Sequence, residues 1–91
     1  MATTTRVTIE LYGVARLRAR VGRLSITADT VGEALRGLAR ACPVLEGSVL
    51  SGDRLLPAYK LSLNGDRFLS DPQTPLSEGD ALLVLSADAG G

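Results

Sequence analysis

The chain has 91 residues, which is enough for one small domain and too few for two separate hydrophobic cores. Apolar residues make up 45% of the chain and aromatic residues only 3%, so we expect a core of aliphatic side chains. Lys and Arg together number 10, as do Asp and Glu, and this balance argues against binding to nucleic acid or to a membrane surface by bulk charge. We therefore expect protein partners, no nucleic acid and no membrane.

The residue types that are missing exclude several kinds of site. The sequence has no histidine, which excludes His-based catalytic triads and His-ligated zinc sites. Its single cysteine, Cys42, cannot form an internal disulfide or a two-cysteine metal or redox motif. There is no apolar leader segment and no run of about 20 apolar residues that could span a bilayer. We expect a cytoplasmic protein without a metal site.

Two strands are predicted in the first part of the chain. Polar and apolar residues alternate over residues 6–12 and again over 23–27, as in strands with one buried face. The residues expected on the buried face of the first strand are Val7, Ile9 and Leu11. Several arginines lie between the two strands, and we place them on the long loop of a hairpin.

A helix is predicted to begin at Thr30, which forms a capping box with Glu33. The residues that follow one apolar stripe at helical spacing are Val31, Ala34, Leu35, Leu38 and Cys42. Pro43 ends the pattern. We interpret Cys42 as the last core position of the stripe rather than as a reactive thiol.

The second half of the chain predicts three further strands. Residues 44–57 are expected to be a loop with one short element. Strands over 59–63 and 66–69 flank Asn64-Gly65, the preferred pair for a two-residue type I′ turn. Residues 81–85 form a continuous apolar run, which is typical of a central strand.

This order of elements predicts an α+β domain over residues 1–86, with four to five strands packed on one main helix. Because one helix covers one face, half of the apolar residues in the last strand are left on the other face as a candidate docking surface. We predict Leu82 and Val84 as this exposed pair. The charge is divided along the chain, with seven arginines and three acidic residues in 1–45, and three basic and seven acidic residues in 46–91. Such a dipole can steer a partner.

Residues 87–91 are predicted to be a flexible tail that ends in Gly90-Gly91. Glycine has no Cβ, so this pair can be threaded through a narrow channel of another protein. The five residues after Ser86 could reach roughly 16 Å, enough to enter a partner's active site. The other predicted partner contacts on the tail are Ala87, Asp88 and Ala89.

Four segments together carry a family resemblance: residues 30–35 (TVGEAL), 63–66 (LNGD), 74–80 (TPLSEGD) and the final Gly90-Gly91. With them the chain resembles the MoaD/ThiS family of ubiquitin-like sulfur carriers over nearly its whole length. The overall length and the 44–57 segment resemble the MoaD branch. The resemblance implies the β-grasp fold, a mixed sheet packed on one main helix.

The resemblance also implies a function. An adenylating partner enzyme would use ATP to activate the Gly91 carboxylate, with Gly90 before it, and a sulfur donor would convert the product to a thiocarboxylate. A second partner, such as the large subunit of molybdopterin synthase, would accept the sulfur. The chain would then be a carrier and not an enzyme, with no bound cofactor.

Other functions stay open at this point. Carriers for cysteine, thiazole, tRNA or other thio-metabolite synthesis share the same segments. A ubiquitin-like modifier that is conjugated to lysines, and a β-grasp interaction domain with an inert tail, are alternatives from other classes.

Overall fold

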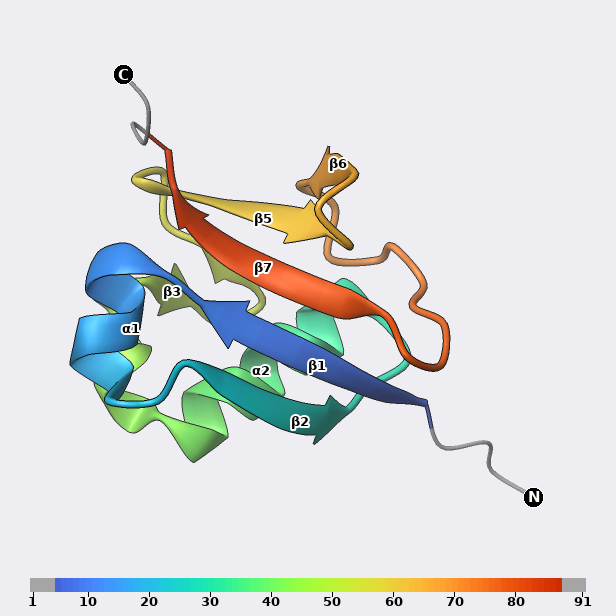
Figure 1. The fold of residues 1–91 in the computed structure, drawn as a ribbon, viewed down its shortest axis with the longest axis horizontal. Helices are drawn as coiled ribbons and strands as arrows, with labels where there is room; N and C mark the ends of the chain where they lie inside the picture. Colours follow the sequence, from blue (N-terminus) through green and yellow to red (C-terminus); the bar gives the residue numbers. More distant parts are fainter. Residues whose placement is uncertain (1–4, 88–91) are drawn as a thin grey trace.

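A five-stranded mixed sheet forms the centre of the structure, a computed structural model that describes residues 5–87 (Figure 1). Its strand order is β2-β1-β7-β5-β6. The strands are β1 (Arg6–Leu11), β2 (Arg23–Thr27), β5 (Tyr59–Leu63), β6 (Arg67–Leu69) and β7 (Ala81–Ser86). β1 and β7 run parallel, and the other neighbours are antiparallel. The apolar last strand therefore occupies the predicted central position.

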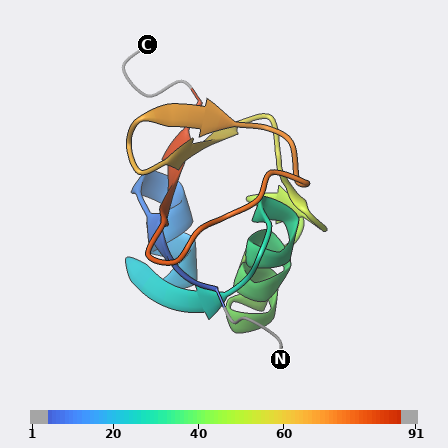
Figure 2. The same cartoon turned by 90° about the vertical axis from the view of Figure 1, so that its right-hand side faces the viewer.

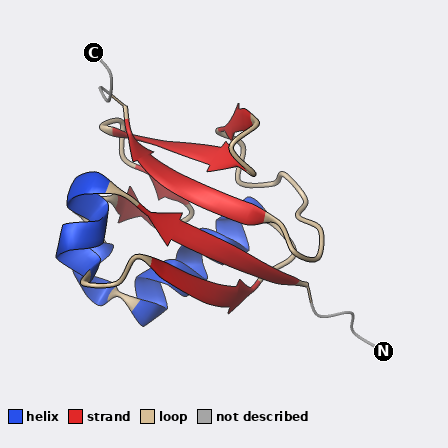
Figure 3. Ribbon diagram, viewed as in Figure 1, coloured by secondary structure: helices blue, strands red, loops and turns tan. Residues whose placement is uncertain are grey.

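The remaining elements lie on one face and at one end of this sheet (Figures 2 and 3). They are α1 (Gly13–Ala19), α2 (Val31–Ala41), the 3₁₀ helix η1 (Pro43–Leu45), and a small hairpin of β3 (Leu50–Ser51) and β4 (Arg54–Leu55). α2 packs against one face of the sheet, and α1 lies at the end of the sheet (Figures 1 and 2). This arrangement confirms the predicted α+β, β-grasp architecture with one main helix. The proposed division between residues 1–86 and 87–91 stays a prediction.

The start of α2 agrees with the capping box in the sequence. Thr30 Oγ1 accepts a hydrogen bond from the Glu33 N–H at 3.3 Å, and Glu33 Oε1 accepts one from the Asp29 N–H at 2.9 Å. At the other end the Cys42 N–H donates to the Leu38 carbonyl at 2.8 Å. The Cys42 side chain is buried, as its place in the apolar stripe predicts.

Removal of the Thr30 side-chain oxygen tests its role as the cap of α2. We expect Thr30→Ala to lower the free energy of unfolding by about 1 kcal/mol, because a helix N–H loses its partner. Thr30→Ser keeps the oxygen and is the matched control, with stability close to that of the wild type. Chemical denaturation measures both variants, and equal losses in the two would contradict a capping role.

The core lies between α2 and the sheet and is aliphatic, as the composition predicts. Its strand residues are Val7, Ile9, Leu11, Leu61, Leu63, Leu82 and Val84. Its α2 residues include Val31, Ala34, Leu35 and Leu38. Fully burying one such Leu, Ile or Val stabilises the fold by about 1.5–3 kcal/mol.

Two connections contain more regular structure than predicted. The connection after β1 contains α1, which buries Ala15 completely. The 44–57 segment contains η1 and the β3–β4 hairpin, which bury Leu45, Val49 and Leu50 (each 0% exposed). Both segments therefore complete the core, because these apolar side chains belong to the same buried cluster as those of α2 and the sheet.

A turn is centred on Asn64-Gly65 as predicted, but the connection between β5 and β6 has three residues instead of two. Asn64 and Gly65 have φ values of 57° and 71°, the left-handed conformation that a type I′ turn requires. The flanking strands pair Leu63 with Arg67, which leaves three residues in the loop. Asn64 also ties the turn to the start of β7, since its Oδ1 accepts from the Ala81 N–H at 2.8 Å.

Candidate functional site

Four predicted site residues lie outside the described part of the chain: Asp88, Ala89, Gly90 and Gly91. Ala87 is the last described residue, and its N–H donates to the carbonyl oxygen of Ala58 at 2.7 Å. Ser86 pairs with Tyr59 in the sheet register. The backbone is thus held beside the start of β5 up to residue 87, which fixes the point from which the chain continues toward Gly91.

The prediction that Leu82 and Val84 form the exposed pair of the last strand is wrong. Both are 0% exposed. Both align with buried residues of β1 and β5, namely Ile9, Leu11, Leu61 and Leu63. They therefore belong to the face that α2 covers, and the alternate pair, Leu83 and Leu85, lies half-buried on the opposite face.

Four side chains give that opposite face an apolar surface, which we call the outer-face patch: Tyr12, Phe68, Leu83 and Leu85. Phe68 is 63% exposed and Tyr12 is 40% exposed. Leu83 and Phe68 both align with Ser62, which places them on either side of β5 on the same face. No described helix packs on this face (Figures 1 and 2). The patch is a candidate docking surface of the kind that the sequence predicts, on the other residues of the strand.

A shallow depression of about 250 Å³ lies at the end of this patch. Its lining includes Tyr12, Lys60, Phe68, Leu85 and Ala87. Because Ala87 forms part of the wall, the chain leaves the sheet from within the docking surface. A partner seated on the patch would therefore meet the segment that leads to Gly91.

Lys60 brings a positive charge to the patch. It is the only lysine in the sequence, and its Nζ lies 5.0 Å from the centre of the Phe68 ring. An ammonium group over an aromatic face is attracted by the electron density of the ring. Lys60 also aligns with Leu85 across the strands, so an acidic side chain of a partner would find a cation next to an apolar anchor.

Tyr12 contributes its ring to the patch and its hydroxyl to a hydrogen bond. The hydroxyl donates to Glu10 Oε1, and this bond raises the pKa of Tyr12 above its usual value. Arg16 and Arg23 act in the opposite direction on the same pKa through their charge. The phenol therefore stays protonated at neutral pH and serves as a hydrogen-bonding contact.

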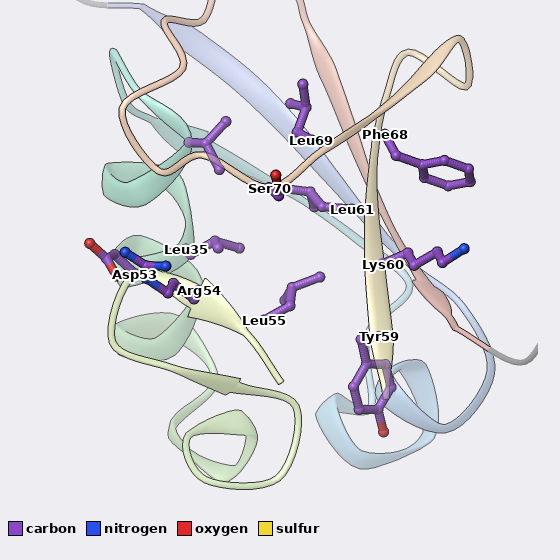
Figure 4. A pocket seen from close by; sticks show the side chains of 11 residues that line it. Leu35, Asp53, Arg54, Leu55, Tyr59, Lys60, Leu61, Phe68, Leu69 and Ser70 are labelled. Carbon is purple, nitrogen blue, oxygen red and sulfur yellow. Dashed lines mark ion pairs between the residues drawn. The ribbon is translucent and has the colours of Figure 1, made fainter. Parts of the chain in front are cut away.

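A cavity of about 410 Å³ lies on the other side of the sheet, between α2, β4 and β5 (Figure 4). Leu35, Leu55, Leu61 and Leu69 point into it, whereas Lys60 and Phe68 point away toward the outer face (Figure 4). Asp53 lies at its rim, paired with Arg36 at 3.3 Å and with Arg54 at 3.6 Å. The leucine-lined interior offers no acid–base pair, so this cavity is not a candidate catalytic site.

Two further findings concern the kinds of site that the described chain offers. Residues 5–87 contain no group of three or more Cys, Asp or Glu side chains placed to hold a metal ion. Neither α1 nor α2 has the length and apolar character of a membrane-crossing helix.

Comparison with known proteins supplies the fold relationship. No protein-family model matches the sequence, and no curated protein matches it. Solved structures do match. Small archaeal modifier protein 1 (SAMP1) from Methanosarcina acetivorans superimposes with a TM-score of 0.81 at 22% identity, over 99% of this chain and 100% of that chain.

Two other similar structures come from complexes. The Amycolatopsis orientalis BexX/CysO complex contains a chain that matches with a TM-score of 0.76 at 19% identity, over 93% of this chain and 99% of that chain. The complex of subunits 1 and 2 of the molybdopterin-converting factor from Helicobacter pylori contains one that matches with a TM-score of 0.66 at 23% identity, over 96% of this chain and 100% of that chain. The chain thus has the ubiquitin-like β-grasp fold, and its resemblance to the MoaD/ThiS family is confirmed at the level of the fold.

Proposed function

We propose that this protein is a sulfur carrier whose C-terminal Gly91 carboxylate is activated by a partner enzyme and converted to a thiocarboxylate. The observation that carries the proposal is the position of Ala87. It is bonded to Ala58 in the wall of the depression on the outer-face patch, four residues before the final glycine. A protein that docks on the patch would receive the Gly-Gly end at a defined place.

The proposed chemistry needs no catalytic group from this chain. The Gly91 carboxylate attacks the α-phosphate of ATP, which forms an acyl-adenylate and releases pyrophosphate. A donor that supplies hydrosulfide then displaces AMP and leaves a thiocarboxylate. The thiocarboxylate sulfur then bonds to an electrophilic carbon of the acceptor and displaces a leaving group there. Water hydrolyses the resulting thioester, which leaves the sulfur on the acceptor and restores the Gly91 carboxylate. ATP is bound by the adenylating partner, so this chain acts as a co-substrate.

For the acceptor, our first choice is the large subunit of molybdopterin synthase. Similarity to a chain in the molybdopterin-converting factor complex supports this choice. Similarity to the BexX/CysO complex equally supports a carrier for another sulfur acceptor. Binding assays with a large molybdopterin synthase subunit, a cysteine synthase and a thiazole synthase would separate these pathways, because only the cognate acceptor should bind the thiocarboxylate form and remove its sulfur.

A ubiquitin-like modifier is the second candidate, and the similarity to SAMP1 favours it. In that case the activated Gly91 would form an amide with a lysine of a target protein. Lys60 is the only lysine in this chain, so chains of several copies could grow only through Lys60 or the N-terminal amine. Covalent adducts that withstand hydroxylamine would indicate a modifier, whereas a thiocarboxylate is consumed by alkylating reagents.

A blocked C-terminus tests the role of the terminal carboxylate. We expect a chain extended by a short peptide after Gly91 to lose activation by its adenylating enzyme, because the reacting carboxylate is moved away from the glycine pair. The same peptide on the N-terminus is the matched control and should leave activation unchanged. Release of pyrophosphate from ATP reports the reaction. Full activation of the C-terminally extended chain without its cleavage would overturn the proposed function.

A further inference from the structure

The surface of α1 combines exposed apolar and basic side chains. The helix packs on the domain through Ala15, which is 0% exposed, while Val14 and Leu17 are 50% and 77% exposed. Leu17 and Arg18 follow Val14 by three and four positions, so the three side chains share one face of the helix. Arg20 follows at the end of the helix. We call Val14, Leu17, Arg18 and Arg20 the α1 ridge.

Positive charge predominates around the α1 ridge, although Glu10 shares a depression with Arg16 and Arg23. Residues 11–28 contain four arginines and no acidic residue. Among residues 5–87 the ion pairs are those of Asp53 with Arg36 and Arg54, on another part of the molecule. Of the four arginines, Arg23 aligns with Glu10 across the β1–β2 pair. Arg18 and Arg20 therefore present positive charge beside two exposed aliphatic side chains.

The backbone of Arg20 points to a use for its side chain. Arg20 has a φ of 62°, the left-handed conformation that commonly ends a helix and that favours glycine. Its N–H donates to the Arg16 carbonyl at 2.9 Å, a bond that glycine would make as well. An arginine at this position costs conformational energy. Such a local conflict is typical of a residue whose side chain serves binding.

We propose that the α1 ridge binds an acidic segment of a partner protein that carries a large aliphatic side chain. The aliphatic group would pack between Val14 and Leu17, and carboxylates on either side of it would pair with Arg18 and Arg20. The ridge shares no residue with the outer-face patch, and the proposal does not depend on sulfur transfer.

The charges and the size of the ridge favour a protein over a membrane or a nucleic acid. The whole chain has no net charge, so an extended anionic surface would gain no bulk attraction from it. α1 has seven residues, and its two exposed aliphatic side chains bury too little area to hold the chain in a bilayer. The ridge also has no aromatic side chain on which a base could stack.

A titration with a defined peptide tests the proposal. The probe is the synthetic peptide Asp-Glu-Leu-Leu-Glu-Asp, added to ¹⁵N-labelled full-length protein, with amide chemical shifts as the readout. We expect the shifts to concentrate at residues 13–22. The double variant Arg18→Glu/Arg20→Glu and the single variant Leu17→Ser should each raise the dissociation constant by about tenfold or more.

Two further variants separate binding from structure. Arg40→Glu, which changes an exposed arginine on α2, is the matched control and should leave the dissociation constant unchanged. Arg20→Gly should raise the melting temperature, because the left-handed strain is relieved, and should still weaken peptide binding.

Three results would overturn the proposal. The first is the absence of peptide binding, and the second is an equal effect of Arg40→Glu and the ridge variants. The third is tighter binding of phosphatidylglycerol vesicles or of an oligothymidine than of the peptide, with loss in the same ridge variants. That result would assign the ridge to a membrane or a nucleic acid.

Discussion

Leu82→Asp is expected to unfold the domain. Leu82 is 0% exposed and lies between Ile9 and Leu63 in the centre of the sheet. An aspartate there would have to bury a charge without a partner or leave a cavity, and such changes cost more than about 4 kcal/mol. A domain of this size has a total stability of about 5–10 kcal/mol. Circular dichroism and thermal melting would report the loss of the folded state.

The matched control places the same charge on the other face of the same strand. Leu85→Asp should stay folded, because Leu85 is half-buried on the outer-face patch and aligns with Lys60. It should weaken binding of a partner that docks on the patch by about 2 kcal/mol or more. If the two variants are equally unfolded, or if Leu85→Asp binds partners normally, the patch is not a docking surface.

Gly91→Val is expected to abolish activation of the C-terminus. A side chain at this position would hinder entry of the carbonyl carbon into the narrow partner site that the proposed function requires. The stability of the domain should hardly change, since chain termini usually contribute little to it. Pyrophosphate release with the adenylating enzyme measures activation, and thermal melting measures stability.

Cys42→Ala is the control for a different kind of sulfur chemistry. Cys42 is buried at the end of α2, and residues 5–87 contain no histidine to hold it as a thiolate. Its loss should therefore leave activation at Gly91 intact. For the variant of the preceding paragraph, normal activation of Gly91→Val would contradict the role of the glycine pair.

The sequence predicts those elements that are specified within a few residues and by several residues at once. The capping box at Thr30, the apolar stripe of α2 and the Asn64-Gly65 turn each specify a backbone geometry through hydrogen bonds or φ values within a few residues. Alternation in β1 predicts its buried face correctly. These signals are strong because every residue in them favours the same structure.

The elements that the sequence pattern does not predict depend on contacts between residues distant in the sequence. α1 has seven residues and no side-chain cap, so its stability comes from packing of Ala15 rather than from its own sequence. Val14 and Arg18 are four residues apart, as are the two alanines of the segment, and this spacing is compatible with a helix. Gly13 and Gly22 at the two ends of the segment favour a loop instead. β3 and β4 have two residues each, too few for an alternating pattern.

The sequence of β7 alone does not determine which of its residues face the core and which face the candidate docking surface. Residues 81–85 are apolar at every position, so either alternate pair fits the core equally well. The pairing of Leu82 with Ile9 and of Val84 with Leu11 decides between them, because β1 has a clear alternation. The register between two strands distant in sequence thus supplies the information that the strand itself lacks.

One measurement tests the central claim most directly. Wild-type protein, Cys42→Ala and Gly91→Val are incubated with the adenylating enzyme, ATP and a sulfur donor, and each is analysed by intact-protein and fragment mass spectrometry. Our account predicts that the wild type and Cys42→Ala gain the mass difference between one sulfur and one oxygen atom, located on Gly91, and that Gly91→Val gains none. Sulfur uptake that is lost only in Cys42→Ala, or that maps to any residue other than Gly91, would contradict it.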